Sequence, residues 1–247
     1  MYAPVFVMMV FSFNHSPSHN HWGGLSLRWY QDLFNDPNIR VALTNTLSVA
    51  ILSTVIATVI GTIAAVGIDS LGRKSKQIIM GFTTLPVFNP EILTGVSLML
   101  LFTFAISILG FGRMGYMTLL LGHISFNVSY VILSVMPRLR RLDSNLFEAA
   151  QDLGALPFQA FVKVILPAVR PGIITGALLA FTLSVDDFVV SFFTAGPGVS
   201  NLSILIFSMA RRGISPRINA LSTIIFVVVM LLLFVLNSIS DKKEKNA

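Results

Sequence analysis

The chain has 247 residues, of which 17 are Lys or Arg and 11 are Asp or Glu, so that charged residues make up only 11% of it. A typical soluble domain has about 25% charged residues, whereas hydrophobic residues here reach 54% and the mean hydropathy is +0.80. This composition excludes an ordinary soluble enzyme. The absence of cysteine from the sequence excludes disulfides, thiolate zinc sites and cysteine nucleophiles.

Long uncharged runs predict helices that cross a membrane, since about 20 apolar residues are needed to span a hydrocarbon core about 30 Å thick. In chain order, the predicted spans are residues 1–13, 41–68, 78–109, 116–136, 171–195 and 218–240. We therefore expect an all-α, multi-pass membrane protein with six transmembrane helices, formed as a single domain over residues 1–247. Because the first span is too short to cross a bilayer, we expect this helix to be truncated and to begin upstream.

The distribution of basic residues predicts the orientation. With the N-terminus in the cytoplasm, eleven of the Lys and Arg residues fall in cytoplasmic segments and six fall outside. The positive-inside rule therefore favours cytoplasmic N- and C-termini. The same rule accounts for the net charge of +6, so we do not expect nucleic-acid binding.

Two stripes of small residues recur at every fourth position and predict close helix packing, because small side chains let helix backbones approach each other in lipid. The stripes are Ser53, Ala57, Gly61 and Ala65 in the second span, and Gly172, Gly176, Ala180 and Ser184 in the fifth. The glycine patterns at 67–75 and 110–115 resemble nucleotide-binding loops only in their spacing. Neither follows a strand, so we expect no nucleotide to bind this chain.

The predicted cytoplasmic segment 137–170 has the signals of two short helices. Asp143 or Ser144 is placed to cap the first helix, and Gly154 suits the left-handed position just after its end. Pro157 suits the first position of the second helix. We therefore expect a helix, a sharp turn and another helix.

The second helix of this segment is predicted to have one apolar side. Its members lie three or four residues apart: Phe158, Phe161, Val162 and Ile165. We expect Pro167 to end this helix and Pro171 to restart the chain in the fifth span. Such a helical hairpin predicts a docking site for a protein partner, and the alternative is an amphipathic hairpin that lies on the membrane surface.

The spacing of residues in this hairpin resembles the EAA signature of bacterial ABC-transporter permeases. The matching positions are Glu148, Ala149, Ala150, Gly154, Leu166 and Pro167, and the acidic Asp152 lies among them. The resemblance implies the type I ABC importer permease fold, in which this loop couples the permease to a separate ATPase subunit. It also implies that the chain is not an enzyme and holds no cofactor, since ATP and Mg are bound by the partner ATPase.

Three further places, the third of them a long run in two parts, are similar to the permeases of spermidine/putrescine importers, and most closely to the second of their two permeases, the PotC type. They are residues 24–30, 85–92, 183–198 and 208–216. This resemblance implies polyamine import across a bacterial inner membrane by a heterodimer with a second permease subunit. It also implies an extracytoplasmic substrate-binding protein as a partner. Arg217 departs from the pattern, because polyamine permeases tend to carry an acid there.

Glu91, Asp186 and Asp187 are the only acidic residues within the predicted spans, and no basic residue shares their spans. A charged side chain at the centre of a membrane helix costs about 2.5–3.5 kcal/mol and usually faces a pathway or a partner. We therefore predict that these three acids line a route for a cationic substrate. Trp29 and Tyr30 are predicted to add cation–π contacts.

Each of these residues also has a structural interpretation. Glu91 would begin a helix just after Pro90, and Ser184 would form a capping box with Asp187. The two aromatic residues would belong to an interfacial belt. His123 is expected to be hydrogen-bonded inside the bundle rather than to relay protons.

Two other functions compete with polyamine import. One is an ABC importer permease for another small solute, such as thiamine, a phosphonate or iron. The other is an ion-coupled secondary transporter that uses Glu91 and Asp186 to carry protons, but such a transporter has no need of an ATPase-docking loop. No metal site is predicted at His15, His19 and His21, which lack acidic or thiol neighbours.

Overall fold

The computed structural model describes residues 3–16, 21–110, 112–143, 145–211, 216–228 and 230. Within these ranges the chain is built from helices, apart from one isolated bridge between Asn14 and Leu25. The predicted all-α class is therefore confirmed. Contacts divide the chain into two compact units: a terminal unit of residues 1–43 and 204–247, and a central unit of residues 44–203.

The terminal unit contains α1 (Ala3–Phe11), α2 (Arg28–Asn35), the first turns of α3 (Pro37–Asp69) and most of α11 (Leu202–Arg211). A further helix covers Pro216–Val228. Trp29 and Leu33 are buried on one side of α2. The indole N–H of Trp29 donates a hydrogen bond of 2.7 Å to the carbonyl of Asn14. This bond ties α2 to the segment that follows α1.

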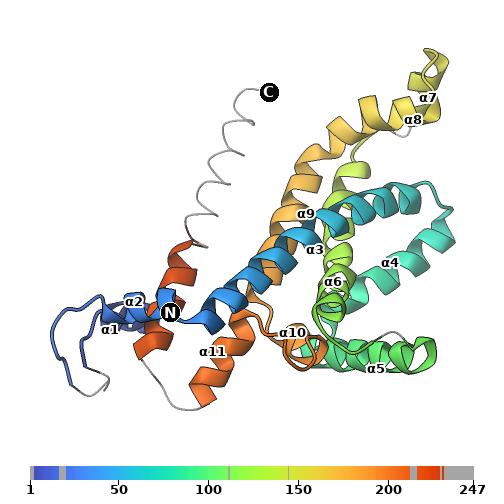
Figure 1. The fold of residues 1–247 in the computed structure, drawn as a ribbon. Helices are drawn as coiled ribbons and strands as arrows, with labels where there is room; N and C mark the ends of the chain where they lie inside the picture. Colours follow the sequence, from blue (N-terminus) through green and yellow to red (C-terminus); the bar gives the residue numbers. More distant parts are fainter. Residues whose placement is uncertain are drawn as a thin grey trace. The chain divides into compact units, whose positions relative to one another are not determined.

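Three long helices form the centre of the central unit: α3, α6 (Tyr116–Leu139) and α9 (Leu166–Asp186), as Figure 1 shows. Small residues of α3 and α9 pack directly against α6. A Cβ added to Gly61 of α3 would lie 2.8 Å from the Cβ of Val131, and one added to Gly176 of α9 would lie 3.1 Å from its Cα. Both small-residue stripes are buried, so the packing predicted from them is confirmed.

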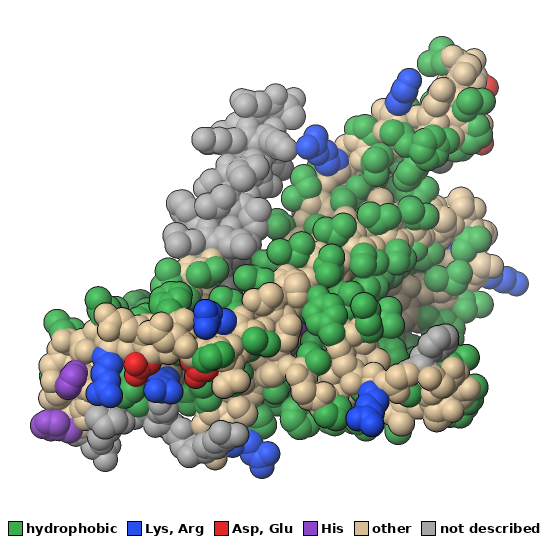
Figure 2. All heavy atoms as spheres, viewed as in Figure 1, with side chains coloured by type: hydrophobic (Ala, Val, Ile, Leu, Met, Phe, Trp, Pro, Cys, Tyr) green, Lys and Arg blue, Asp and Glu red, His purple; other side chains and the backbone are tan. Residues whose placement is uncertain are grey.

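Apolar residues of the same three helices and of the turn before α9 form a core around Val131. Its buried members are Ala65, Ile68, Val131, Ile132, Val135, Met136, Leu139, Ile165, Val169 and Ala180. Another side of α3 exposes Ile51, Val55, Val59 and Ile63, and hydrophobic side chains cover much of the face seen in Figure 2. Exposed apolar surface of this extent indicates contact with lipid.

Four helices among the described residues are long and apolar enough to cross a membrane. They are Pro37–Asp69, Glu91–Leu109, Tyr116–Leu139 and Pro157–Asp186. In the predicted spans 1–13 and 218–240, the described helices Ala3–Phe11 and Pro216–Val228 are shorter, and most of 229–240 lies outside the described residues. Several spanning helices in one chain make this a multi-pass membrane protein.

The predicted single span 78–109 is wrong, because it is two helices. α4 (Arg73–Phe88) and α5 (Glu91–Leu109) meet at an angle in Figure 1. Between them Asn89 and Pro90 are extended, with ψ of 143° and 132°. A residue before proline disfavours the helical conformation, and proline has no N–H to continue the ladder. The chain therefore breaks where Pro90 follows Asn89.

The predicted span 171–195 is also interrupted. α9 ends at Asp186, Asp187 is extended with ψ of 122°, and the short helix α10 (Val189–Thr194) follows. The side chain of Asp187 supplies the reason for this break, because it binds backbone N–H groups of α10 that have no partner within their own helix.

Candidate functional site

A cavity of about 170 Å³ lies in the central unit next to both helix breaks. The lining side chains that matter for its chemistry are Glu91, Phe126, Tyr130, Asp186, Asp187 and Phe188. The structure therefore brings together the three acids that were singled out in separate parts of the sequence. Their role in a substrate pathway stays a prediction.

Glu91 and Asp186 present free carboxylates at this cavity. Both residues are exposed, and neither carboxylate forms a hydrogen bond or an ion pair with any residue that the structure describes. Glu91 is in the first turn of α5, as the structural interpretation of this acid expected. Asp186 is the last residue of α9, where unpaired helix carbonyls add negative partial charge. These two acids give the cavity its acidic character.

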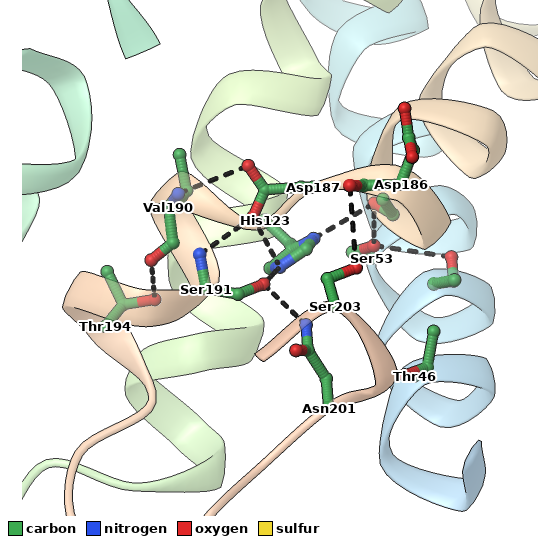
Figure 3. A network of polar contacts seen from close by, with 12 residues as sticks. Thr46, Ser53, His123, Asp186, Asp187, Val190, Ser191, Thr194, Asn201 and Ser203 are labelled. Carbon is green, nitrogen blue, oxygen red and sulfur yellow. Dashed lines mark hydrogen bonds and ion pairs between the residues drawn. The ribbon is translucent and has the colours of Figure 1, made fainter. Parts of the chain in front are cut away.

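Asp187 differs from its neighbour because its carboxylate is already engaged. Its side chain is only 8% exposed, and it accepts hydrogen bonds from the backbone N–H of Val190 at 3.2 Å and of Ser191 at 2.7 Å. Figure 3 shows these bonds, with the carboxylate of Asp186 pointing away from them. Asp187 thus caps α10, and the predicted capping box with Ser184 does not form.

His123 of α6 is fully buried beside this break. Its Nδ1 lies 3.2 Å from the hydroxyl of Ser184, and its Nε2 lies 2.9 Å from the hydroxyl of Ser191. The carboxylate of Asp187 lies 3.7 Å from Nε2. His123 is therefore a hydrogen-bonded bundle residue, as predicted.

Two asparagines extend this buried network. Asn127 donates to the hydroxyls of Ser184 at 2.7 Å and Ser53 at 3.2 Å, and Asn201 donates to the hydroxyl of Ser191 at 2.7 Å. The network joins α3, α6, α9 and α10 (Figure 3). Sequence reasoning placed Ser53 in a packing stripe, and Ser184 in a packing stripe or a capping box, and missed this connection. The available signal was the set of polar side chains within otherwise apolar spans.

Trp29 and Tyr30 belong to the terminal unit, where both have partners. The indole of Trp29 is 7% exposed and carries the guanidinium of Arg28 at 5.4 Å from its ring centroid. The hydroxyls of Tyr30 and Ser12 are 2.7 Å apart. These contacts give both residues a packing role within their unit, and their contact with substrate stays a prediction.

Arg217 also lies in the terminal unit. Its guanidinium is 3.5 Å from the carboxylate of Asp32, which is in turn 3.9 Å from the guanidinium of Arg28. The residue that departs from the polyamine-permease pattern is therefore partly neutralised by an acid of its own unit.

The predicted docking loop begins with α7 (Leu146–Asp152). The residue at its N-cap is Asn145 rather than Asp143, whose carboxylate instead accepts a bond from the Asn145 N–H; Ser144 lies outside the described residues. Gly154 has φ of +87°. Its N–H binds the carbonyl of Gln151 at 2.8 Å, and the next N–H binds that of Ala150 at 3.1 Å. This is the Schellman motif, so the predicted left-handed turn is confirmed.

The second half of the loop begins as predicted, with Pro157 at the start of α8 (Pro157–Ala160). The prediction that Pro167 ends this helix is wrong, because a helix runs without interruption over Pro157–Asp186. It includes a π-helical turn, η1 (Phe161–Ile165), in which the N–H of Leu166 reaches the carbonyl of Phe161. This wider turn makes room for the ring of Pro167, which would otherwise press on the preceding turn.

The loop exposes both apolar and acidic side chains at the tip of the central unit. Leu153 is 90% exposed and Phe158 is 75% exposed, and Glu148 and Asp152 are exposed beside them. By contrast, Ile165 is buried in the core, so the predicted apolar side does not act as one surface. The π-helical turn separates the exposed part from the buried part.

A second cavity, of about 620 Å³, lies beneath this loop. Its lining includes Asp69, Lys76, Arg140, Phe147, Glu148 and Ile165. Segments 69–77 and 137–170 therefore meet at the same end of the central unit. This agrees with their assignment to the same side of the membrane.

Apolar helices, an acid-lined cavity between two helix breaks and an exposed helical loop together define a membrane permease. The chain belongs to the family described as "Binding-protein-dependent transport system inner membrane component", which it matches over residues 57–245. Members of this family are permease subunits, and they are not enzymes.

Curated relatives extend over nearly the whole chain. It is 39% identical to the putrescine transport system permease protein PotI of Escherichia coli K12, with 99% of this chain and 88% of that protein covered. It is 36% identical to the spermidine/putrescine transport system permease protein PotC of the same strain, with 99% and 91% covered. The corresponding PotC of Haemophilus influenzae is 34% identical, with 100% and 93% covered.

A solved structure has the same fold. It is a bacterial ABC transporter involved in the import of the acidic polysaccharide alginate, with a TM-score of 0.74 and 18% identity, covering 98% of this chain and 90% of that chain. At this identity the likeness concerns the fold alone, which is that of a type I ABC importer permease.

Proposed function

We propose that this chain is one of two membrane-spanning subunits of an ATP-driven importer that moves polyamines into the cytoplasm. The observation that carries this proposal is a pair of carboxylates, Glu91 and Asp186, that meet at one cavity among membrane-spanning helices and pair with no residue that the structure describes. Relatives named as putrescine and spermidine/putrescine permeases support the substrate class. A polyamine carries the complementary charges.

The chemistry of the cavity suits a flexible polycation. Ammonium groups pair with Glu91 and Asp186, while Phe126, Tyr130 and Phe188 offer ring faces to the same molecule. Both carboxylates are exposed at the cavity, so the attraction is moderate and the substrate is released. Pathway roles for these residues, and for Trp29, Tyr30 and Asp187, belong to this proposal.

The exposed loop carries the proposed coupling to ATP hydrolysis. Its apolar tip residues and its acids Glu148 and Asp152 form a surface for a separate ATPase subunit, which binds ATP and Mg. Ala149, Ala150, Gly154, Leu166 and Pro167 shape that surface. The basic segments near it support a cytoplasmic location for the loop and for both chain termini. A second permease subunit completes the pathway as a heterodimer, and an extracytoplasmic binding protein delivers the substrate.

The proposal is tested by reconstituting the complete complex in proteoliposomes. ATP hydrolysis is measured with binding protein loaded with putrescine or spermidine, and separately with thiamine, a phosphonate and ferric iron. We expect stimulation by a polyamine and none by the other solutes. Stimulation by another solute alone would overturn the substrate class and leave the permease assignment intact.

The residue assignment is tested with Glu91→Gln in the same complex. Loss of the charge removes one attraction to the substrate, so uptake is expected to fall severalfold while the complex still assembles. Thr94→Ser is the matched control, because Thr94 lies one turn away on α5 at the same cavity and carries no charge. Unchanged uptake in Glu91→Gln would leave Glu91 with only a helix-starting role.

A further inference from the structure

The imidazole of His123 connects two halves of a broken helix. From α6 it reaches Ser184, in the last turn before the break, through Nδ1, and Ser191, in the first turn after it, through Nε2. The distances are 3.2 and 2.9 Å, and all three side chains are buried. One side chain therefore spans the gap between α9 and α10, as Figure 3 shows.

The hydrogen-bond inventory accommodates both contacts. Asn127 donates to Ser184, whose hydroxyl also lies 3.1 Å from that of Ser53, and Asn201 donates to Ser191. For His123, Ser191 offers its hydroxyl proton or its second acceptor position, and Ser184 offers whichever of these its contact with Ser53 does not use. A neutral imidazole has one donor and one acceptor nitrogen. In one tautomer it donates to Ser184 and accepts from Ser191, and in the other tautomer both directions reverse. Either arrangement holds both serines.

The break that His123 spans carries two of the three acids of the cavity. Asp186 and Asp187 lie between the two serines. Asp187 caps α10, and its carboxylate lies 3.7 Å from Nε2 of His123. The position of the Asp186 carboxylate therefore depends on the relative placement of α9 and α10.

These two contacts of His123, which we call the clasp, also affect Glu91 through packing. α10 rests on α5, where a Cβ added to Gly95 would lie 2.8 Å from the ring of Phe193 and 3.3 Å from the carbonyl of Val189. Glu91 begins α5 one turn before Gly95. A shift of α10 is thereby passed to the start of α5, because this contact leaves no space to absorb it.

We propose that His123 is a positioning residue for transport: by holding Ser184 and Ser191 together across the break, it sets the placement of Asp186 and Glu91 around the cavity. The inference rests on the proposed function. It assigns His123 no contact with substrate and no proton transfer. Its loss leaves the carboxylates present but misplaced.

The test measures putrescine imported per ATP hydrolysed by the reconstituted complex with its binding protein. His123→Ala is expected to lower this ratio at least about fivefold, since two buried hydrogen bonds are lost, while assembly and stimulated ATP hydrolysis persist. His123→Asn and His123→Gln each reach one serine, because their amides lie near the positions of Nδ1 and Nε2. Both are expected to restore part of the ratio. Ser125→Ala is the matched control on an exposed face of α6.

A wild-type ratio in His123→Ala overturns the inference, as does a parallel fall of uptake and ATP hydrolysis, which indicates a purely structural role. If His123→Ala fails to assemble, Ser184→Ala and Ser191→Ala decide, each removing one side of the clasp. A reduced ratio in either supports the inference, and normal ratios in both overturn it. Asp186→Asn separates the two proposals: if it lowers uptake and His123→Ala does not, only the inference fails, and if neither does, the proposed pathway fails.

Discussion

Gly61 and Val131 approach so closely that a methyl group on Gly61 would lie 2.8 Å from both the Cβ and the Cγ1 of Val131. Val131 has no room to retreat, because its Cα is also 3.1 Å from the position of a Cβ on Gly176. The α3–α6–α9 bundle is therefore assembled around one valine, and glycine is required on both sides of it.

Gly61→Ala is expected to destabilise the permease by about 1–3 kcal/mol, because the added methyl group overpacks a core that is already closed. The measurement is thermal unfolding of the purified complex in detergent. Val131→Ala in the same chain frees space and should recover part of the loss. Gly67→Ala is the control, since nothing lies within 4 Å of its added Cβ. Equal stability of the Gly61 and Gly67 variants would contradict this packing.

Gly154→Ala is expected to weaken coupling, because alanine at φ of +87° costs about 1–2 kcal/mol and opens the turn between α7 and α8. Binding-protein-stimulated ATP hydrolysis and uptake are the measurements, and Gly154→Asp should have a larger effect. Gly112→Ala supplies a matched control at φ of +58° in the turn before α6. If both alanine variants reduce uptake alike, the effect of Gly154 is general strain and not coupling.

Asp186→Asn and Asp187→Asn are expected to differ in kind, although the residues are adjacent. Asp186 has a free carboxylate, so its variant should reduce polyamine uptake without changing thermal stability. Asp187 caps α10, so its variant should lower stability by about 1 kcal/mol. Uptake and thermal unfolding of both variants are compared in one preparation. The reverse pattern would show that the carboxylate facing the substrate is that of Asp187.

Arg217→Ala is expected to change stability by less than about 1 kcal/mol, because its pair with Asp32 is partly exposed to solvent. Uptake should stay within about twofold of the wild type. Thermal unfolding at low and high salt detects the small contribution, which salt should screen. A large fall in uptake at unchanged stability would instead assign Arg217 to the pathway.

Features that depend on local spacing could be predicted from the sequence. The recurrence of Gly61 and Gly176 within four-residue stripes predicts a buried helix face, and the order of Gly154 and Pro157 predicts a turn between two helices. In each case the deciding residues lie close together along one continuous segment of the chain. The uncharged runs likewise predict membrane helices from composition alone.

The break between α9 and α10 and the contacts of His123 could not be predicted in the same way. Asp187 interrupts its span through bonds made after the chain has bent, and nothing in the apolar pattern marks that bend. His123 finds its partners at Ser184 and Ser191, more than 60 residues further along the chain. Those pairings are set by how α6, α9 and α10 pack, which periodicity along a single helix does not contain. Pro167 misled the prediction because a π-helical turn relieves its clash.

That π-helical turn also sets how far the loop is rotated about the helix axis relative to α9. An α-helix advances by about 100° per residue, and a π-helical turn holds one residue more than an α-helical turn. Residues 161–165 thereby set the direction in which the loop would face the proposed ATPase subunit, independently of the face that α9 turns to α6. Deleting one of these five residues would rotate the docking surface by roughly a quarter turn while the membrane part of α9 stayed in register.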